Sequence, residues 1–107
     1  MVYVKVRVGK TVVFNMPIRE VSHCSLNVGA EARHIITFWY NTAFEPQCVY
    51  ARFRSDQRIS FYDTGKLVSE INIKRGTTND DLYMLFDDKI LPYYNHAKEL
   101  DAVDKLK

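Results

Sequence analysis

The start of the chain alternates valine with larger polar or aromatic side chains, and this alternation constrains the fold most strongly. The valines are Val2, Val4, Val6 and Val8, and the residues between them are Tyr3, Lys5 and Arg7. A period of two places the valines on one face of an extended strand, which predicts a strand with one buried face. Gly9-Lys10 predicts a tight hairpin turn. Thr11 to Met16 then forms the returning strand, which Pro17 ends.

Further extended segments follow the hairpin, and the predicted strands are Ile18–Leu26, Cys48–Arg54, Gln57–Tyr62 and Leu67–Ile73. Asp63 to Lys66 is typical of a hairpin turn in which Gly65 takes a positive φ. Gly29 to Tyr40 fits two patterns, because its apolar residues have helical spacing while Ile35 to Tyr40 alone would pass as a strand.

The last third of the chain has the pattern of an amphipathic helix. Thr78 or Asn79 is a suitable N-cap, and Asp80 and Asp81 in the first turn favour the helix dipole. The apolar stripe consists of Leu82, Leu85, Phe86, Ile90 and Tyr93. Pro92 is expected to kink or end this helix. A further short helix is predicted from Ala97 to Leu106.

Composition places the chain among ordinary globular domains. It has 107 residues, of which 47% are apolar and 26% charged, and this predicts one α+β domain over residues 1–107. No apolar run approaches the roughly 20 residues that a membrane helix needs. The N-terminus lacks the features of a signal peptide, so we expect Cys24 and Cys48 to be reduced thiols in an intracellular protein. The compartment would be the nucleus in a eukaryotic setting and the cytoplasm otherwise.

The residue pattern offers no arrangement typical of an active site. His23 and Cys24 are adjacent, so a strand would place them on opposite faces, where they cannot form a nucleophile–base pair. No Cys/His spacing matches a zinc site, and Gly65-Lys66 lacks the earlier glycine of a phosphate loop. We therefore expect no enzymatic activity, no cofactor and no metal.

Charge is distributed unevenly along the chain. Residues 1–75 carry 11 Lys or Arg and 6 Asp or Glu, whereas residues 76–107 carry 4 and 7. A basic sheet region joined to an acidic helical region hints at an anionic partner on the sheet side.

One succession of landmarks is more specific than the rest. Val21-Ser22 opens a strand, Phe44-Glu45-Pro46 follows at a set distance, and Tyr62 to Val68 forms an aromatic-x-x-Gly-Lys-aliphatic-Val turn. An acidic, aromatic helix then ends near Pro92. This succession, over roughly residues 19–95, resembles one repeat of the TATA-box-binding protein family.

The resemblance implies a curved antiparallel β-sheet with a C-terminal helix on one face. The repeat would occupy residues 18–95, after an N-terminal β-hairpin at 1–17 and before a helical tail at 96–107. It also implies that Gly29 to Tyr40 is helical. The family has two repeats in one chain, so a single repeat would expose a sheet edge, which either a homodimer or the N-terminal hairpin should cover.

In the family, the concave sheet face binds the minor groove of duplex DNA. By position, the resemblance assigns DNA contacts to Val21, Arg52, Arg54, Tyr62, Lys66 and Val68. Two departures weaken this assignment. Arg19 stands near the place of a base-reading asparagine, and Glu70 would put a carboxylate on the same face, where phosphates repel it.

Two hypotheses follow for the function. The first is a single-repeat relative that binds DNA in transcription, as a homodimer. The second is a protein-interaction module on the same fold, a partner of a polymerase or of another transcription factor, that does not bind DNA specifically.

Overall fold

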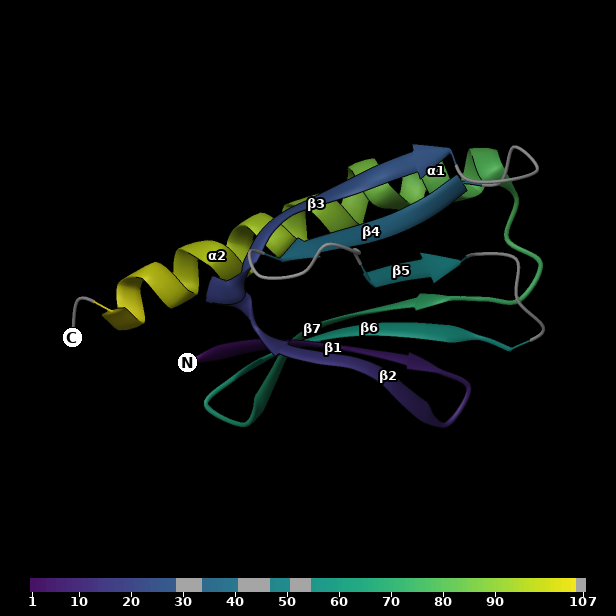
Figure 1. Cartoon of the computed structure of the whole chain (residues 1–107). Helices are drawn as coiled ribbons and strands as arrows, with labels where there is room; N and C mark the ends of the chain where they lie inside the picture. Colours follow the sequence, from purple (N-terminus) through teal and green to yellow (C-terminus); the bar gives the residue numbers. More distant parts are fainter. Residues whose placement is uncertain (29–33, 41–46, 51–54, 106–107) are drawn as a thin grey trace.

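The computed structural model describes residues 1–28, 34–40, 47–50 and 55–105. The chain begins with a hairpin and ends with a long helical segment (Figure 1). In chain order the elements are β1 (Val2–Val8), β2 (Thr11–Pro17), the 3-10 turn η1 (Ile18–Glu20), β3 (Val21–Val28), β4 (His34–Tyr40), β5 (Gln47–Tyr50), β6 (Gln57–Asp63), β7 (Lys66–Ile73), α1 (Asn79–Leu85), the π-helical turn η3 (Phe86–Ile90) and α2 (Leu91–Lys105).

The described strands form two antiparallel sheets rather than the single curved sheet that was predicted. One has the order β2-β1-β6-β7 and the other β3-β4-β5. The N-terminal hairpin belongs to the first sheet, because β1 pairs with β2 on one side and with β6 on the other. The hairpin therefore covers the edge of β6, one of the two ways in which we expected an exposed edge to be covered.

Both sheets and the helical segment share one core. The predicted alternation in β1 is confirmed, since Val2, Val4 and Val6 are buried in this core. Phe14 of β2 stacks on Phe38 of β4 with ring centroids 5.8 Å apart, and Phe38 lies 6.5 Å from the ring of Tyr94 on α2. The chain is thus an α+β protein with antiparallel sheets and a C-terminal helix, and each sheet turns its helix-free face away from the shared core (Figure 1).

The prediction of a helix over Gly29–Tyr40 is wrong for residues 34–40, which form strand β4; residues 29–33 lie outside the described residues. β4 pairs antiparallel with β3 and buries Ile36 and Phe38, residues two apart on one face. β-Branched and aromatic residues fill this segment, and such side chains pack well on a pleated surface once a partner strand is present. The predicted strand from Ile18 also begins later, because Ile18–Glu20 is a 3-10 turn.

The capping prediction is confirmed, because the Thr78 hydroxyl accepts a hydrogen bond from the Asp81 amide at 3.1 Å. Of the two outcomes predicted at Pro92, an end is wrong, since α2 continues past it to Lys105. Residues 97–105, predicted as a separate short helix, are helical but form the last part of α2. The Leu91 amide donates to the Phe86 carbonyl, five residues back. This widened π-helical turn gives the proline ring space that a regular α-helix would deny it.

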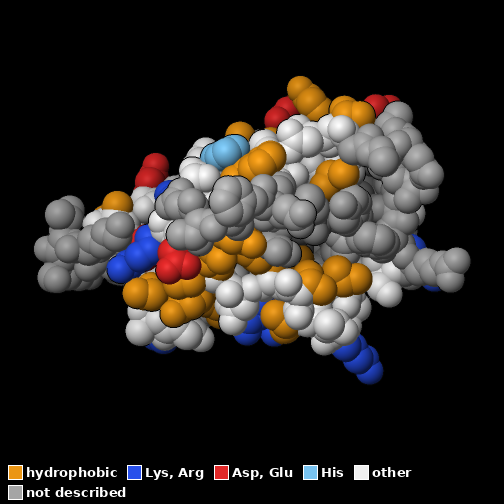
Figure 2. Space-filling view, viewed as in Figure 1, with side chains coloured by type: hydrophobic (Ala, Val, Ile, Leu, Met, Phe, Trp, Pro, Cys, Tyr) orange, Lys and Arg blue, Asp and Glu red, His pale blue; other side chains and the backbone are white. Residues whose placement is uncertain are grey.

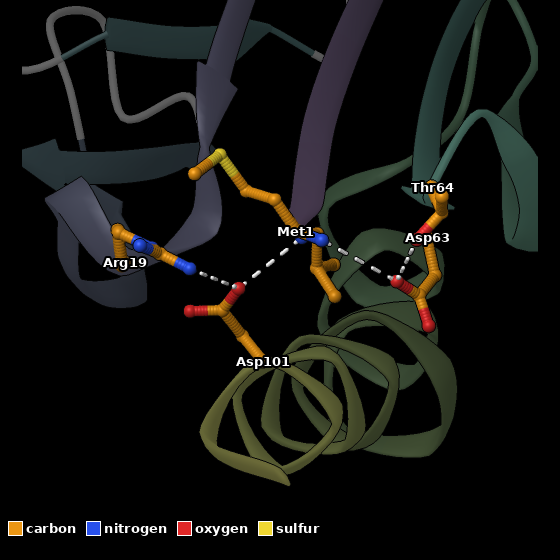
Figure 3. A network of polar contacts seen from close by, with 6 residues as sticks. Met1, Arg19, Asp63, Thr64 and Asp101 are labelled. Carbon is orange, nitrogen blue, oxygen red and sulfur yellow. Dashed lines mark hydrogen bonds and ion pairs between the residues drawn. The ribbon is translucent and has the colours of Figure 1, made fainter. Parts of the chain in front are cut away.

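A buried carboxylate joins the end of the helix to the start of the chain (Figure 3). Asp101 of α2 is 3% exposed, and its Oδ1 accepts hydrogen bonds from the Val2 amide at 3.2 Å and from Arg19 Nη2 at 3.3 Å. Nearby, the N-terminal amine lies 3.8 Å from Asp63 Oδ1. The last turns of α2 are therefore attached to both β1 and η1.

We predict that Asp101→Ala lowers the free energy of unfolding by about 2–3 kcal/mol, because it leaves a buried amide and a half-buried guanidinium without their acceptor. Urea unfolding followed by circular dichroism measures this. Glu99→Ala, at an exposed position of the same helix, is the control and should change the value by less than about 0.5 kcal/mol. Equal effects of the two substitutions would contradict a bonding role for Asp101.

Candidate functional site

The helix-free side of the four-stranded sheet carries a row of charged and aromatic side chains. Because the valines of β1 point into the core, the residues between them point outward, and the register aligns them with Tyr62, Ser60 and Arg58 of β6. We call this surface the outer face; it consists of Tyr3, Lys5, Arg7, Arg58, Ser60, Tyr62, Glu70 and Asn72. In Figure 2, Lys and Arg side chains project at the lower margin of the molecule, beside β1 and β2.

A cation and an aromatic ring meet on the outer face, near the β6–β7 turn. Lys5 Nζ lies 5.2 Å from the centroid of the Tyr62 ring, within the range of a cation–π contact. Around this pair is a shallow hollow of about 350 Å³, which Tyr3, Asn15 and Gly65 also line. The hollow thus combines a positive charge, ring surfaces and an amide, groups that bind phosphates and bases in nucleic-acid complexes.

Glu70, which we expected to repel phosphates, is held by its neighbours on the outer face. Ser60 Oγ donates a hydrogen bond to Glu70 Oε2 at 3.1 Å, and Arg58 Nε lies 3.6 Å from Glu70 Oε1. Arg58 Nε also donates to Asn72 Oδ1 at 3.0 Å. Arg58 offsets the charge of the carboxylate, so the net charge of the outer face stays positive through Lys5 and Arg7.

Three of the predicted site residues lie together on the hairpin of β6 and β7. Lys66 is exposed at the turn, and Val68 is 39% exposed. Phe61 pairs with Ser69 and Tyr62 with Leu67, so Val68 is the extra residue of a β-bulge. The structure thus brings Tyr62, Lys66 and Val68 to one end of the sheet. Arg52 and Arg54 lie outside the described residues.

The assignment of Val21 to the binding surface is wrong. Val21 lies in β3 of the other sheet, is 0% exposed and belongs to the core. Its carbonyl accepts hydrogen bonds from the Tyr94 hydroxyl at 3.2 Å and from Lys98 Nζ. A side chain buried in the core in this way cannot contact a ligand on the outer face.

Sequence reasoning missed Tyr3, Lys5 and Arg58 as members of the surface. The signal for Tyr3 and Lys5 was present, because the alternation in residues 2–8 already placed them opposite the buried valines. What the sequence did not reveal was the pairing of β1 with β6, which brings these residues beside Tyr62.

The cysteine and histidine that are adjacent in the sequence point to different sides of β3, as predicted. Cys24 is buried, whereas His23 is exposed and stacks on Trp39 with ring centroids 5.4 Å apart. Burial raises the pKa of the Cys24 thiol to about 12, so it stays protonated at neutral pH. Among the described residues, no group of three His, Cys, Asp or Glu side chains is placed to hold a metal ion.

Comparison with protein-family models, with curated proteins and with solved structures finds no match. In the described part of the chain, no helix is long and apolar enough to cross a membrane.

We predict that native stability decreases between about pH 9 and pH 12, because the unfolded Cys24 thiol ionises near 9.0 while burial keeps the folded thiol protonated to about 12. The loss should reach at most about 1.4 kcal/mol per pH unit from this group. Urea unfolding across this range, for the native chain and for Cys24→Ala, measures it. The variant should show a shallower decrease; identical slopes would contradict a buried, protonated thiol.

Proposed function

We propose that this protein binds duplex DNA through the outer face of the β2-β1-β6-β7 sheet, in transcription, as a single-repeat relative of the TATA-box-binding protein. The observation that carries the proposal is the Lys5–Tyr62 pair beside its open hollow, flanked by Arg7 and Lys66. Lysine and arginine contribute phosphate contacts, and an exposed ring with an aliphatic neighbour contributes contacts to sugars and bases.

The family relationship is supported by the β6–β7 hairpin. Tyr62 lies near the end of β6, Gly65 lies in the turn with a φ of +81°, and Lys66 and Val68 lie at the start of β7, the succession that the resemblance implies. Strand β4 departs from the family pattern, which has helices at that place in the chain. The proposal therefore assigns DNA contacts to the hairpin and to β1, and none to β3 or β4.

A salt series tests the proposal. We predict that AT-rich duplex DNA binds at about 50 mM salt and that the logarithm of affinity falls linearly with the logarithm of salt concentration, because each phosphate contact releases counterions. Fluorescence anisotropy with AT-rich and GC-rich duplexes measures the slope of log affinity against log salt concentration and the preference for AT-rich sequence. Undetectable binding at the lowest salt would remove the proposal.

The combined variant Lys5→Ala/Arg7→Ala/Lys66→Ala locates the binding surface and leaves the Arg58–Glu70 ion pair in place. We expect it to weaken duplex binding by at least about tenfold and to reduce the salt slope by about 2–3, one unit per lost phosphate contact. Lys89→Ala, an exposed lysine on the helical segment, is the matched control and should change neither. Loss of binding in Lys89→Ala with retention in the combined variant would assign the DNA to the other side of the protein.

A protein-interaction role for the same sheet is the second candidate, favoured by apolar side chains at its margins. Val12 and Val13 of β2 are 46% and 45% exposed, and Leu67 of β7 is 53% exposed. A partner that packs on these residues should remain bound to the Lys5/Arg7/Lys66 variant, because the contact is apolar. Pull-down of candidate transcription proteins with the native chain and this variant separates the two roles.

A further inference from the structure

A groove lies on the far side of the molecule from the outer face, between strand β3 and the helical segment. Its volume is about 420 Å³, and its lining residues are Cys24, Ser25, Leu26, Val28, His34, Tyr83, Phe86, Asp87 and Leu91. Consecutive residues of β3 line it although their side chains alternate between the two faces of the sheet. The groove therefore follows the edge of the strand, where backbone amides and carbonyls are presented.

This edge differs from those of the four-stranded sheet. Among the described strands, β3 pairs with β4 alone. Its register shifts between Val21 and His23, before the groove, and is regular along the groove from Cys24 to Val28. β2 and β7, the outer strands of the other sheet, each lie beside a register irregularity of the kind that blunts an edge against pairing. The β3 segment also has no charged residue and no proline, the other common means of protection.

The side of the groove formed by the helical segment is apolar at its base and acidic at its rim. Phe86 is buried, while Tyr83 is 56% exposed and Val28, across the groove, is 67% exposed. Asp87 lines the groove, and the neighbouring carboxylates Asp80, Asp81 and Asp88 are also exposed. Apolar side chains of a ligand would bury against the rings, and basic ones would meet the carboxylates.

We propose that this groove binds an extended peptide segment of another protein, in which an apolar stretch is flanked by basic residues, and that the segment adds to the sheet as a strand beside β3. The peptide backbone pairs with the edge between Cys24 and Val28, and its apolar side chains pack against Tyr83 and Phe86. A second copy of this chain is disfavoured as the occupant. β3–β3 pairing would bring two identical acidic helical segments together, and their like charges would repel.

The probe for the test is a fluorescein-labelled synthetic peptide about ten residues long, in which alternating valine and serine residues carry lysines at both ends, titrated into the full chain at about 50 mM salt. We call it the valine–lysine peptide; the valine–glutamate peptide has glutamates in place of the lysines. We expect saturable binding and amide NMR shift changes concentrated at Cys24–Val28 and Tyr83–Leu91. The same peptide with alternate amides N-methylated should not bind, because it lacks the donors that pair with the strand edge. A valine–glutamate peptide should bind at least about tenfold more weakly because of the acidic rim.

Asp87→Lys should lower the affinity for the valine–lysine peptide by about tenfold. Glu99→Lys, a similar charge reversal at an exposed site of α2, should leave that affinity within about twofold of the native value. Equal binding of the N-methylated peptide, or shift changes confined to the outer face, would overturn the proposal. So would a dimer in light scattering that Val28→Lys dissociates, since a second copy would then occupy the groove. Duplex binding to the outer face is a separate reaction, and its failure would not affect these outcomes.

Discussion

The two-sided composition of β1 determines both the interior and the proposed working surface of this protein. β1 is an inner strand between β2 and β6, so its valines pack at the centre of the core while Lys5 and Tyr3 are delivered to the outer face. A slip of one residue in register would exchange these two sets and expose the valines. Asp101 contributes to fixing this register, because its carboxylate accepts a hydrogen bond from the Val2 amide at the start of the strand.

Local patterns in the sequence predicted the local elements well. The alternation in β1, the turn at Gly65 and the Thr78 cap each depend on residues close together in the chain, and each is confirmed. Long-range pairing was not accessible in this way. The valines of β1 predict that one face of the strand is buried, but they do not predict which elements pack against it. One such long-range contact is that of Phe14 with Phe38, which joins the two sheets. The sequence therefore predicts only part of the candidate site. Tyr62 and Lys66 flank a local turn that the sequence indicates, whereas Lys5 reaches Tyr62 only through the pairing of β1 with β6.

The two failures in secondary structure have a common cause. The family pattern favours a helix where β4 forms, although the segment is rich in β-branched and aromatic residues. The intrinsic propensity of proline favours an end of the helix at Pro92, although α2 continues past it. In each case tertiary context decided the outcome: β3 provides pairing for β4, and a π-helical turn provides room for the proline. Neither the partner strand nor the widened turn has a signature in the local sequence.

In the folded protein, the basic and acidic parts of the chain lie on different surfaces. Lys5, Arg7 and Arg58 lie on the outer face, whereas the exposed aspartates of α1 and η3 lie on the segment that packs against the opposite side of the core. Separation by a full core thickness, about 10 Å or more, exceeds the Debye length of about 8 Å at physiological salt, so the two potentials do not cancel. An anionic ligand on the outer face and a basic peptide beside β3 would then occupy the protein together without competing for the same charges, which is the arrangement expected of a protein that connects two different partners.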